Sequence, residues 1–570
     1  MKREKDLPRR TLMAVAVLLA ENVGAGPFDL GDPDWSVRWD NSLRASAKVR
    51  TESADPALKD SFRQVPTGAT SPAPATFSFP QALNFNAGDQ NFQSKGLVSE
   101  RVDLLSEFDA VFRKDYGMRL SAGGWYDAKL HKATQADNDP TIGQTPYNEF
   151  PDHTKKIAGG DAELLDAFAF GGWRIGDGMK LTARLGRHAL QYGESLFFGD
   201  NGIARAQGPV DIDKLLASPN AQFKEVVRPV PQLSAQLQVS PVVSVGGYYQ
   251  FKWEADRLPP EGSYFSTSNI PWNSLQPEFV GIPSGPIAGN YVLVPGTDEK
   301  PKNGGQFGLE LKWHLESTDL GFYFARYHDK SGQLYGALDV LAPANAFGSK
   351  PGTWNYVFPE GIRTFGMSFS RSVGDFNIAG EASIRDNAPL RSTNMLYPVP
   401  FATQPLYATG RTGHANLSTL ASFGPSFIAR ESGLVAEIAW NTVLKKDDPA
   451  QELDGGRTKS ATAAQLIFTP TYRQVAPGLD LNVPVGMRYT LAGQSSVTGW
   501  DAKHTGSANV GIDATYLGVW QFGLSYTHYI GKAVPFVDYS PSLTGGVPIY
   551  GLGNPLADRD YVALSVRRTF

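Results

Sequence analysis

Hydrophobic and polar positions alternate along many segments of the chain, and the alternation is plainest in the last ten residues, YVALSVRRTF (561–570). One side of an extended strand would carry Val562, Leu564, Val566 and Phe570. The other side would carry Tyr561, Ala563, Ser565, Arg567 and Thr569. A period of two predicts a β-strand with one apolar face.

The same period recurs upstream, with charges on the polar face. It is clear in 35–50, 101–113, 118–130, 243–254, 306–315, 376–384, 434–444, 481–491 and 520–526. The apolar faces end in Trp, Tyr or Phe, and we assign Leu130 and Trp253 to such faces. A soluble sandwich also alternates, but one core must then absorb every apolar face. Charged faces opposite apolar faces with aromatic ends instead match a membrane barrel, with lipid outside and a wet lumen inside.

Connections support the barrel interpretation. Short turns at 114–117, 175–178, 239–242, 316–319, 372–375, 475–478 and 516–519 separate hairpin strands. Between them lie long Pro/Gly-rich segments near 51–96, 132–160, 193–230, 255–305, 329–361, 387–411, 447–457, 493–504 and 532–558. With a strand at 412–423, short and long connections alternate. We therefore predict an all-β fold: one antiparallel transmembrane barrel of about 18 strands, or 16, with short periplasmic turns and long outer loops. Strand 35–50 would close the sheet against the last strand.

Composition is consistent with this fold. The chain has 570 residues, a net charge of −4 and no cysteine, which excludes disulfides and thiolate metal sites. The near-neutral net charge argues against a nucleic-acid partner. The N-terminus has a basic stretch, an apolar core at 11–20 and small residues after it, the layout of a signal peptide cut near Ala25. A disordered basic tail leading into a short core helix is the alternative. Residues 26–570 would then form the barrel in the outer membrane, among its lipid and lipopolysaccharide.

Three stretches carry a resemblance to a known family. GRHALQYGES contains Gly186, Arg187, Tyr192, Gly193, Glu194 and Ser195. The others are GPVDIDKLLASPNAQFKE (208–225) and YYQFKWEADRLPPEGSYFS (248–266). Together they resemble the outer-membrane proteins described as domain of unknown function 1302. Tyr192 departs from the expected Trp, and Gly208 from the expected Asn. The resemblance implies a barrel. It also implies a link to the uptake or export of hydrophobic compounds, including steroids and hydrocarbons, with which the family is often associated.

The last residue fits the same class. Outer-membrane barrels commonly end on Phe or Trp, which the assembly machinery reads, and Phe570 resembles that signal. Arg568 would face lipid. It would lie within ~7 Å of the interface, where a charge costs less.

Charged residues of both signs are the candidate lumen and constriction groups. They are Arg101, Asp103, Glu107, Arg119, Asp127, Lys129, Arg184, Arg187, His188, Glu194, Asp211, Asp213, Lys214, Glu310 and Lys312. A strongly ion-selective pore would show one sign in a ring. The mixture favours an ion-pair network around a plug, or a weakly selective channel.

Residues 193–230 are a candidate segment that folds into the lumen. Asp211 would cap a short helix at 211–218. An Arg187–Glu194 pair would anchor the segment or bind the polar head of a ligand. The alternative is a purely structural ion pair together with a tight turn at Gly193. A cap on the surface is the alternative to an inward fold.

The outer loops are apolar at 279–296, 335–347 and 394–408, which indicates packing into a lid, with capture of an apolar ligand as a second use. The acidic loop 445–456 lacks the spacing of a calcium site. No cofactor, metal or phosphate motif appears. A hydrolase would need a converging triad; His528 lies on the lipid side, and only His188 and Ser195 fall near one loop.

We therefore expect a channel that passes small, hydrophobic molecules by diffusion. The alternative is export of lipid or hydrophobic compounds with a periplasmic lipid-carrier partner, and a barrel hydrolase ranks third.

Overall fold

The structure of the protein is a computed structural model that describes residues 26–28, 30–59, 63–66, 76–79, 84–136, 148–176, 178–218, 223–282, 287–345, 348–392, 395–400, 405–538 and 549–570. The expected signal peptide, 1–25, lies outside the described residues.

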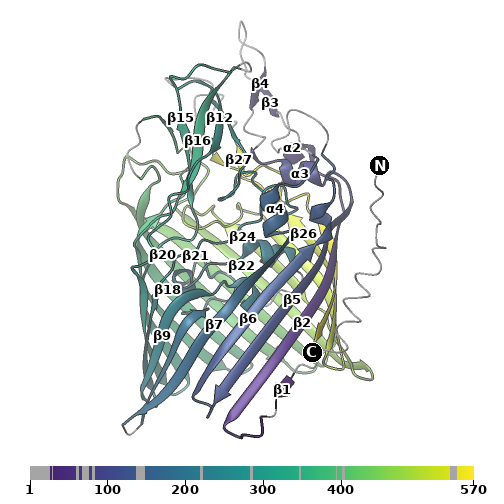
Figure 1. The fold of residues 1–570 in the computed structure, drawn as a ribbon, viewed down its shortest axis with the longest axis vertical. Coiled ribbons are helices and arrows are strands. Elements are labelled where there is room, and N and C mark those ends of the chain that lie inside the picture. The colour runs from purple at the N-terminus through teal and green to yellow at the C-terminus, as the bar shows by residue number, and fades with distance from the viewer. Residues whose placement is uncertain are drawn as a thin grey trace.

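Eighteen antiparallel strands close into one barrel in the described part of the chain (Figure 1). They are β2 (Trp35–Arg50), β5 (Gly96–Phe112), β6 (Tyr116–Asp127), β7 (Gly160–Ile175), β8 (Met179–His188), β9 (Val230–Ser240), β10 (Val243–Gln250), β13 (Gln306–Leu315), β14 (Thr318–Tyr327), β17 (Ile362–Val373), β18 (Phe376–Pro389), β20 (Thr409–Phe423), β21 (Glu431–Lys446), β22 (Ser460–Ala476), β23 (Leu479–Asn482) continued by β24 (Val485–Ala492), β25 (Gly506–Tyr516), β26 (Trp520–Ile530) and β29 (Tyr561–Thr569). The predicted fold and strand number are confirmed.

The barrel closes between its first and last long strands, as predicted. β2 pairs with β29 from Ser42↔Thr569 to Arg50↔Tyr561. The Phe570 amide then donates to the Asn41 carbonyl at 2.9 Å, and the Asn41 amide donates to the Phe570 carbonyl at 2.8 Å. The short strand β1 (Gly26–Phe28) pairs with β2 beyond this point. Arg568 lies outward, over the rings of Trp520 and Phe570.

The outer face of the barrel is apolar. Its exposed side chains include Leu104, Leu164, Leu185, Leu233, Leu309, Phe322, Phe365, Met367, Leu417, Ile438, Leu466, Met487, Ile512, Leu524 and Leu564. Such a surface is costly in water and favourable against lipid. Among the described residues no helix is long and apolar enough to cross a membrane.

Two residues assigned to the lipid side are instead buried among other parts of the protein. The strand containing Leu130 ends at Asp127 and continues as a 3-10 helix, η2 (Ala128–His131). Leu130 therefore packs with Phe92 and Phe150 in a buried cluster. Trp253 follows the end of β10 and packs in a second cluster above the barrel. The prediction was wrong at both because the alternation was extended past the last barrel residue, where protein replaces lipid.

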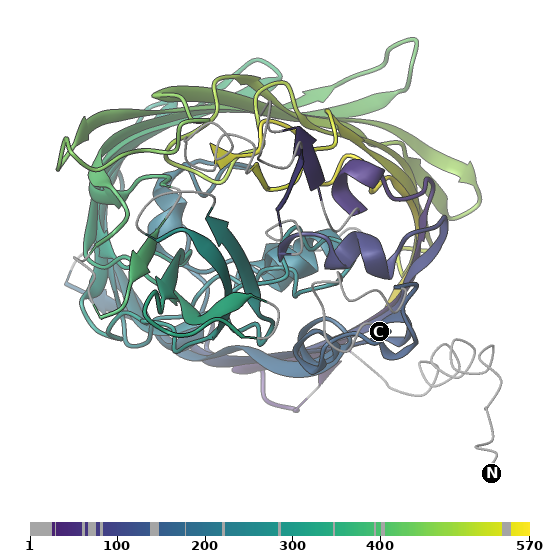
Figure 2. The ribbon, with the colours of Figure 1, turned by 90° about the horizontal axis from the view of Figure 1, so that it is seen from above.

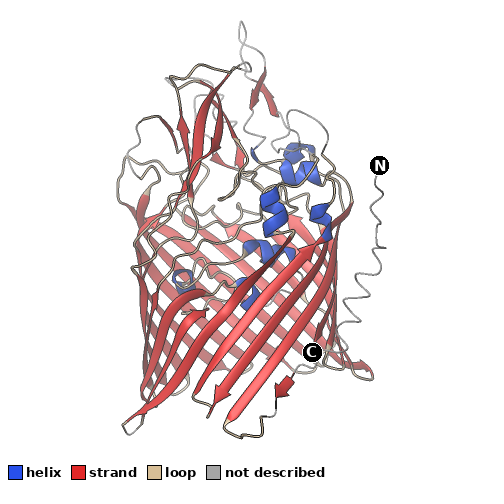
Figure 3. Cartoon of the chain, in the orientation of Figure 1, coloured by secondary structure: helices blue, strands red, loops and turns tan. Residues whose placement is uncertain are grey.

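Short helices and small strand pairs lie within the barrel outline and above it (Figures 2 and 3). The helices are α2 (Pro56–Lys59), α3 (Ala87–Asn91), α4 (Asp152–Ile157), η3 (Ile203–Ala206), α5 (Ile212–Ala217) and α6 (Phe223–Val226). The strand pairs are β3 (Arg63–Pro66) with β4 (Thr76–Phe79), and β27 (Val537–Asp538) with β28 (Ile549–Tyr550).

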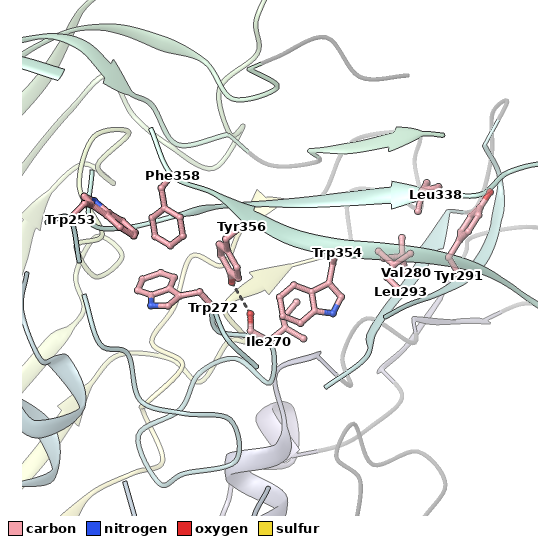
Figure 4. Close-up of a cluster of buried hydrophobic side chains, with 10 residues drawn as sticks. All are labelled: Trp253, Ile270, Trp272, Val280, Tyr291, Leu293, Leu338, Trp354, Tyr356 and Phe358. Atoms are coloured by element: carbon pink, nitrogen blue, oxygen red, sulfur yellow. Dashed lines mark hydrogen bonds between the residues drawn. The ribbon is translucent and has the colours of Figure 1, made fainter. Parts of the chain in front are cut away.

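Described parts of the three apolar loop stretches join one further strand in a sheet beyond the long-loop end of the barrel (Figure 1). This loop sheet contains β11 (Glu278–Ile282), β12 (Gly289–Pro295), β16 (Ser349–Val357), β15 (Gln333–Leu338) and β19 (Leu396–Pro398). One face packs on Trp253, Trp272 and Phe358 (Figure 4). The Tyr356 hydroxyl in this cluster donates to the Ile270 carbonyl at 2.8 Å. Packing thus accounts for the buried apolar residues of these stretches, among them Val280, Tyr291, Leu293, Tyr335 and Leu338.

The loop sheet contains a buried acid, Glu278, which yields a pH prediction. Glu278 is 6% exposed and its Oε2 has no hydrogen-bond partner among the described residues. Burial raises the pKa of Glu278 from 4.5 to about 8. Between these two values the unfolded sheet loses the proton while the folded sheet keeps it. Stability of the loop sheet therefore falls by up to about 1.4 kcal/mol per pH unit as the pH rises across this window, and changes no further above it.

Amide hydrogen exchange in β12 and β16, measured from pH 5 to pH 9, tests the predicted loss of loop-sheet stability with rising pH. We expect protection to decline as the pH rises in the wild-type protein, and Glu278→Gln to flatten the decline. A pH profile that Glu278→Gln leaves unchanged would contradict the assignment.

Candidate functional site: the lumen and its insert

The inner face of the barrel carries charged residues of both signs, and most of them are paired. Arg101 donates to Asp103 at 2.9 Å, and Arg44 contacts Asp103 and Glu225 at 3.4 and 3.1 Å. Arg119 contacts Glu107, Asp109 and Asp166. Asp127 accepts from Ser99 at 2.5 Å, and Lys312 lies 3.6 Å from Glu310. These candidate residues thus form a network along the wall.

Residues 189–229 connect β8 to β9 and are called the insert below; all but 219–222 are described. Its first part lies against β18, β20 and β21, across the lumen from its origin. Glu437 of β21 accepts hydrogen bonds from three successive backbone amides, those of Leu196, Phe197 and Phe198, at 2.5–3.2 Å. Glu381 of β18 accepts from the amides of Glu194 and Ile203 at 2.7 and 2.9 Å. Two wall carboxylates therefore hold the loop by its backbone.

Asn201 is the centre of this attachment. Its side chain is fully buried and donates to Asn416 Oδ1 at 2.7 Å, while its own oxygen accepts from Asn441 at 3.0 Å. Arg385 donates to the carbonyls of residues 200, 201 and 202 at 2.8–3.0 Å. The loop's amides and carbonyls are thus both satisfied by wall side chains, as a buried turn requires.

Gly193 allows the loop to approach this closely. Its φ is +87°, and a Cβ there would lie 2.1 Å from Glu381 Oε2. The preceding aromatic, Tyr192, is buried against Tyr248 and Tyr323, with ring centroids 5.5 and 5.8 Å apart.

The second part of the insert lies against β2, β5, β6 and β7. Asp211 caps α5 by accepting from the Lys214 amide at 2.8 Å, so the predicted capped helix is present. Arg257 contacts Asp211 at 2.6 Å and Glu163 of β7 at 2.7 Å. Its guanidinium and the Lys214 ammonium both lie over the ring of Trp125. Asp213 is buried on the same helix.

The predicted Arg187–Glu194 pair does not form in the structure. Arg187 instead contacts Glu254 at 2.9 Å, because Glu194 has moved with the loop toward β18. His188 is buried, with Nε2 2.8 Å from Ser234 Oγ and Nδ1 3.1 Å from the Gly186 carbonyl. Ser195 Oγ is buried without a described hydrogen-bond partner. The residues named for a hydrolase therefore share no hydrogen bond. Lys129 lies in η2 over the ring of Phe92 rather than on a strand.

The three stretches that carry the family resemblance meet at this insert. Arg187 of the first pairs with Glu254 of the third. Asp211 of the second pairs with Arg257 of the third, and the Val210 amide donates to Asp256 at 2.9 Å. Sequence reasoning missed Glu381, Glu437, Asn201 and Arg385. Glu381, Glu437 and Arg385 offered only a polar side chain at an inward strand position, which many other residues share, and Asn201 was one polar residue within the candidate segment 193–230.

The inner wall is covered unevenly. On β2 and β5, Arg44, Ser46, Lys48 and Arg101 are 2–4% exposed beneath the insert. On β22 to β26 many inward side chains remain partly or fully exposed, among them Gln465, Ile467, Asn509, Thr515, Gln521, Ser525 and Thr527. The charged side chains on this face are Arg488, Asp513 and the paired Arg473 and Asp480. This solvent-accessible strip, called the neutral strip below, is separated from the charged wall at β2 by the single strand β29. Among the described residues no group of acids and histidines could hold a metal ion.

A closed sheet with an apolar exterior, a polar interior and an insert held across it defines a transmembrane β-barrel. The chain belongs to the family described as "Protein of unknown function (DUF1302)", whose model matches residues 7–570. No curated protein matches the chain.

Solved structures similar to the chain include three outer-membrane proteins. OccAB2 of Acinetobacter baumannii has 8% identity and a TM-score of 0.39, with 94% of this chain and 98% of that chain covered. OpdK of Pseudomonas aeruginosa has 7% identity and a TM-score of 0.37, with the same coverage. OmpF of Salmonella typhi, in complex with daunomycin, has 9% identity and a TM-score of 0.32, again over 94% and 98%. Scores this low assign no function to this chain.

Proposed function

We propose that the protein is an outer-membrane channel through which small, predominantly hydrophobic molecules diffuse. The observation that carries the proposal is the insert, which is attached to both sides of the lumen but leaves the neutral strip accessible. A barrel of this size otherwise encloses a wide aqueous channel. An insert fixed by buried hydrogen bonds narrows the channel without sealing it.

The chemistry of the remaining path supports weakly polar solutes. The neutral strip offers hydroxyl and amide groups, and its charges are of both signs: Arg488, Asp513 and the paired Arg473 and Asp480. Leu196 and Leu215 of the insert are 42% and 53% exposed. A path of mixed small polar and apolar groups binds an uncharged solute weakly, which favours entry and release.

Solute flux into liposomes containing the purified barrel tests the proposal. We expect entry of uncharged aromatic solutes to exceed that of sugars of equal mass, together with measurable ion conductance in planar bilayers. A barrel that passes neither ions nor solutes would contradict channel function.

Export with a periplasmic partner is the second candidate, and one feature favours it. The turn 424–430 is longer than the other turns at its end of the barrel, and Phe427 on it is 99% exposed. A hollow of about 450 Å³ beside it is lined by Phe423, Phe427 and Phe468. Loss of entry of a hydrophobic carbon source in a deletion strain would favour import, whereas accumulation of the compound inside would favour export.

We further propose that the assembly machinery recognises Phe570. Changing Phe570→Ser should remove most of the folded, heat-modifiable protein from the outer membrane, whereas Phe570→Trp should preserve it. Both variants keep the backbone hydrogen bonds to Asn41, so they differ only in the side chain. Normal assembly of Phe570→Ser would contradict recognition of this residue.

A further inference from the structure

Arg184 is a cation of the inner wall whose side chain has no ion-pair or hydrogen-bond partner among the described residues. It lies on β8 directly opposite Phe170 of β7 and Ser234 of β9, both on the inward face, and its side chain is exposed. Arg44, Arg101 and Arg119 on the same face all contact carboxylates. Arg184 forms no ion pair with any described residue.

Two phenylalanines occupy inward positions beside it, where a wet lumen favours polar groups. The Arg184 guanidinium carbon lies 5.6 Å from the centre of the Phe168 ring. The Phe168 and Phe170 ring centroids are 6.3 Å apart, and both residues are partly exposed. The Ser234 hydroxyl is already bonded to His188, so Arg184 is the group with free donors.

We propose that Arg184, Phe168 and Phe170 form a binding site for an amphiphilic organic anion, a carboxylate attached to an aryl or alkyl body. A guanidinium lying on a ring face keeps its N–H edge free, and that edge matches the two oxygens of a carboxylate. The two rings would receive the apolar body. The site names a substrate class for the proposed channel and rests on that proposed function.

The test uses the full-length barrel and 4-phenylbutyrate as the probe, with acetate and 4-phenylbutanol for comparison. Block of ion current in planar bilayers reports occupancy during conduction, and equilibrium dialysis in detergent reports binding without conduction. We expect 4-phenylbutyrate to act at lower concentration than either comparison compound. Arg184→Gln should raise its half-blocking concentration about ten-fold, as expected for a lost charge-assisted pair. Arg184→Lys and Phe168→Ser should each raise it by less.

Lys180→Gln is the matched control, because Lys180 lies on the same face of β8 but is already paired with Asp115 at 2.8 Å. Equal behaviour of wild type and Arg184→Gln, or equal block by acetate and 4-phenylbutyrate, would overturn the site. Conductance without this selectivity would refute the site and keep the channel. Binding that depends on Arg184 in a barrel that conducts no ions would refute the channel and keep the site.

Discussion

Glu437→Leu should raise single-channel conductance about two-fold or more, toward that of the unobstructed barrel. Glu437 accepts from three consecutive backbone amides of the insert and from Asn416 at 2.7 Å. Hydrogen bonds to a charged acceptor contribute about 1.5–3 kcal/mol each, and an unsatisfied buried amide adds a further cost. The loop at 194–203 should therefore detach from β21. Adding Glu381→Leu should increase the effect, because it removes the remaining carboxylate.

Glu310→Leu is the control for these variants. Glu310 is also an inward, buried glutamate, but it pairs with Lys312 on its own strand and accepts no described bond from the insert. Planar-bilayer recordings should show Glu310→Leu close to wild type. If Glu437→Leu left the conductance unchanged while the barrel stayed folded, the insert would not limit the path.

Arg257→Leu should release the other half of the insert. Arg257 joins Asp211 of the α5 cap to Glu163 of the wall, and its loss leaves both carboxylates without their closest cation. Removing one member of a buried pair costs about 3 kcal/mol. Amide exchange in α5 should accelerate about a hundred-fold for that loss.

Arg473→Leu serves as the comparison. Arg473 also contacts two carboxylates, Glu431 and Asp480, both at 3.1 Å, but its side chain is 63% exposed. We expect the rate of amide exchange in α5 to be unchanged in Arg473→Leu, since exposed ion pairs contribute little to stability. Equal rates of α5 amide exchange in Arg257→Leu and Arg473→Leu would contradict the anchoring role of Arg257.

The barrel was predictable because its strands contact two uniform surroundings. Lipid on one side and lumen on the other impose a period of two that any short window reveals, as in 306–315. The prediction was wrong at Leu130 and Trp253, where the chain leaves the barrel and is surrounded by other loops. The local alternation of apolar and polar residues does not predict contacts between loops that are distant in the sequence.

The lumen site was predictable only in part. The capped helix at Asp211 depends on neighbours three residues apart, so the sequence identifies it. Partners of Arg187 and Glu194 depend on where a loop crosses the barrel. Glu194 bonds to a residue 187 positions away, and Leu196 to one 241 positions away. No local sequence pattern indicates which of the many inward glutamates accepts the hydrogen bonds from these loop amides.

Thiol labelling of two single-cysteine variants tests the account most directly, since the chain has no native cysteine. Ser525 and Ser46 both face inward on strands next to β29, opposite Ala563 and Ser565. Ser525 lies on the neutral strip, whereas Ser46 is 2% exposed beneath the insert. A bulky, membrane-impermeant thiol reagent should label Ser525→Cys at least ten-fold faster, on the order expected from exposure, and reduce its conductance. Equal labelling of the two, or labelling of Ser525→Cys with no change in current, would contradict a path along β22 to β26.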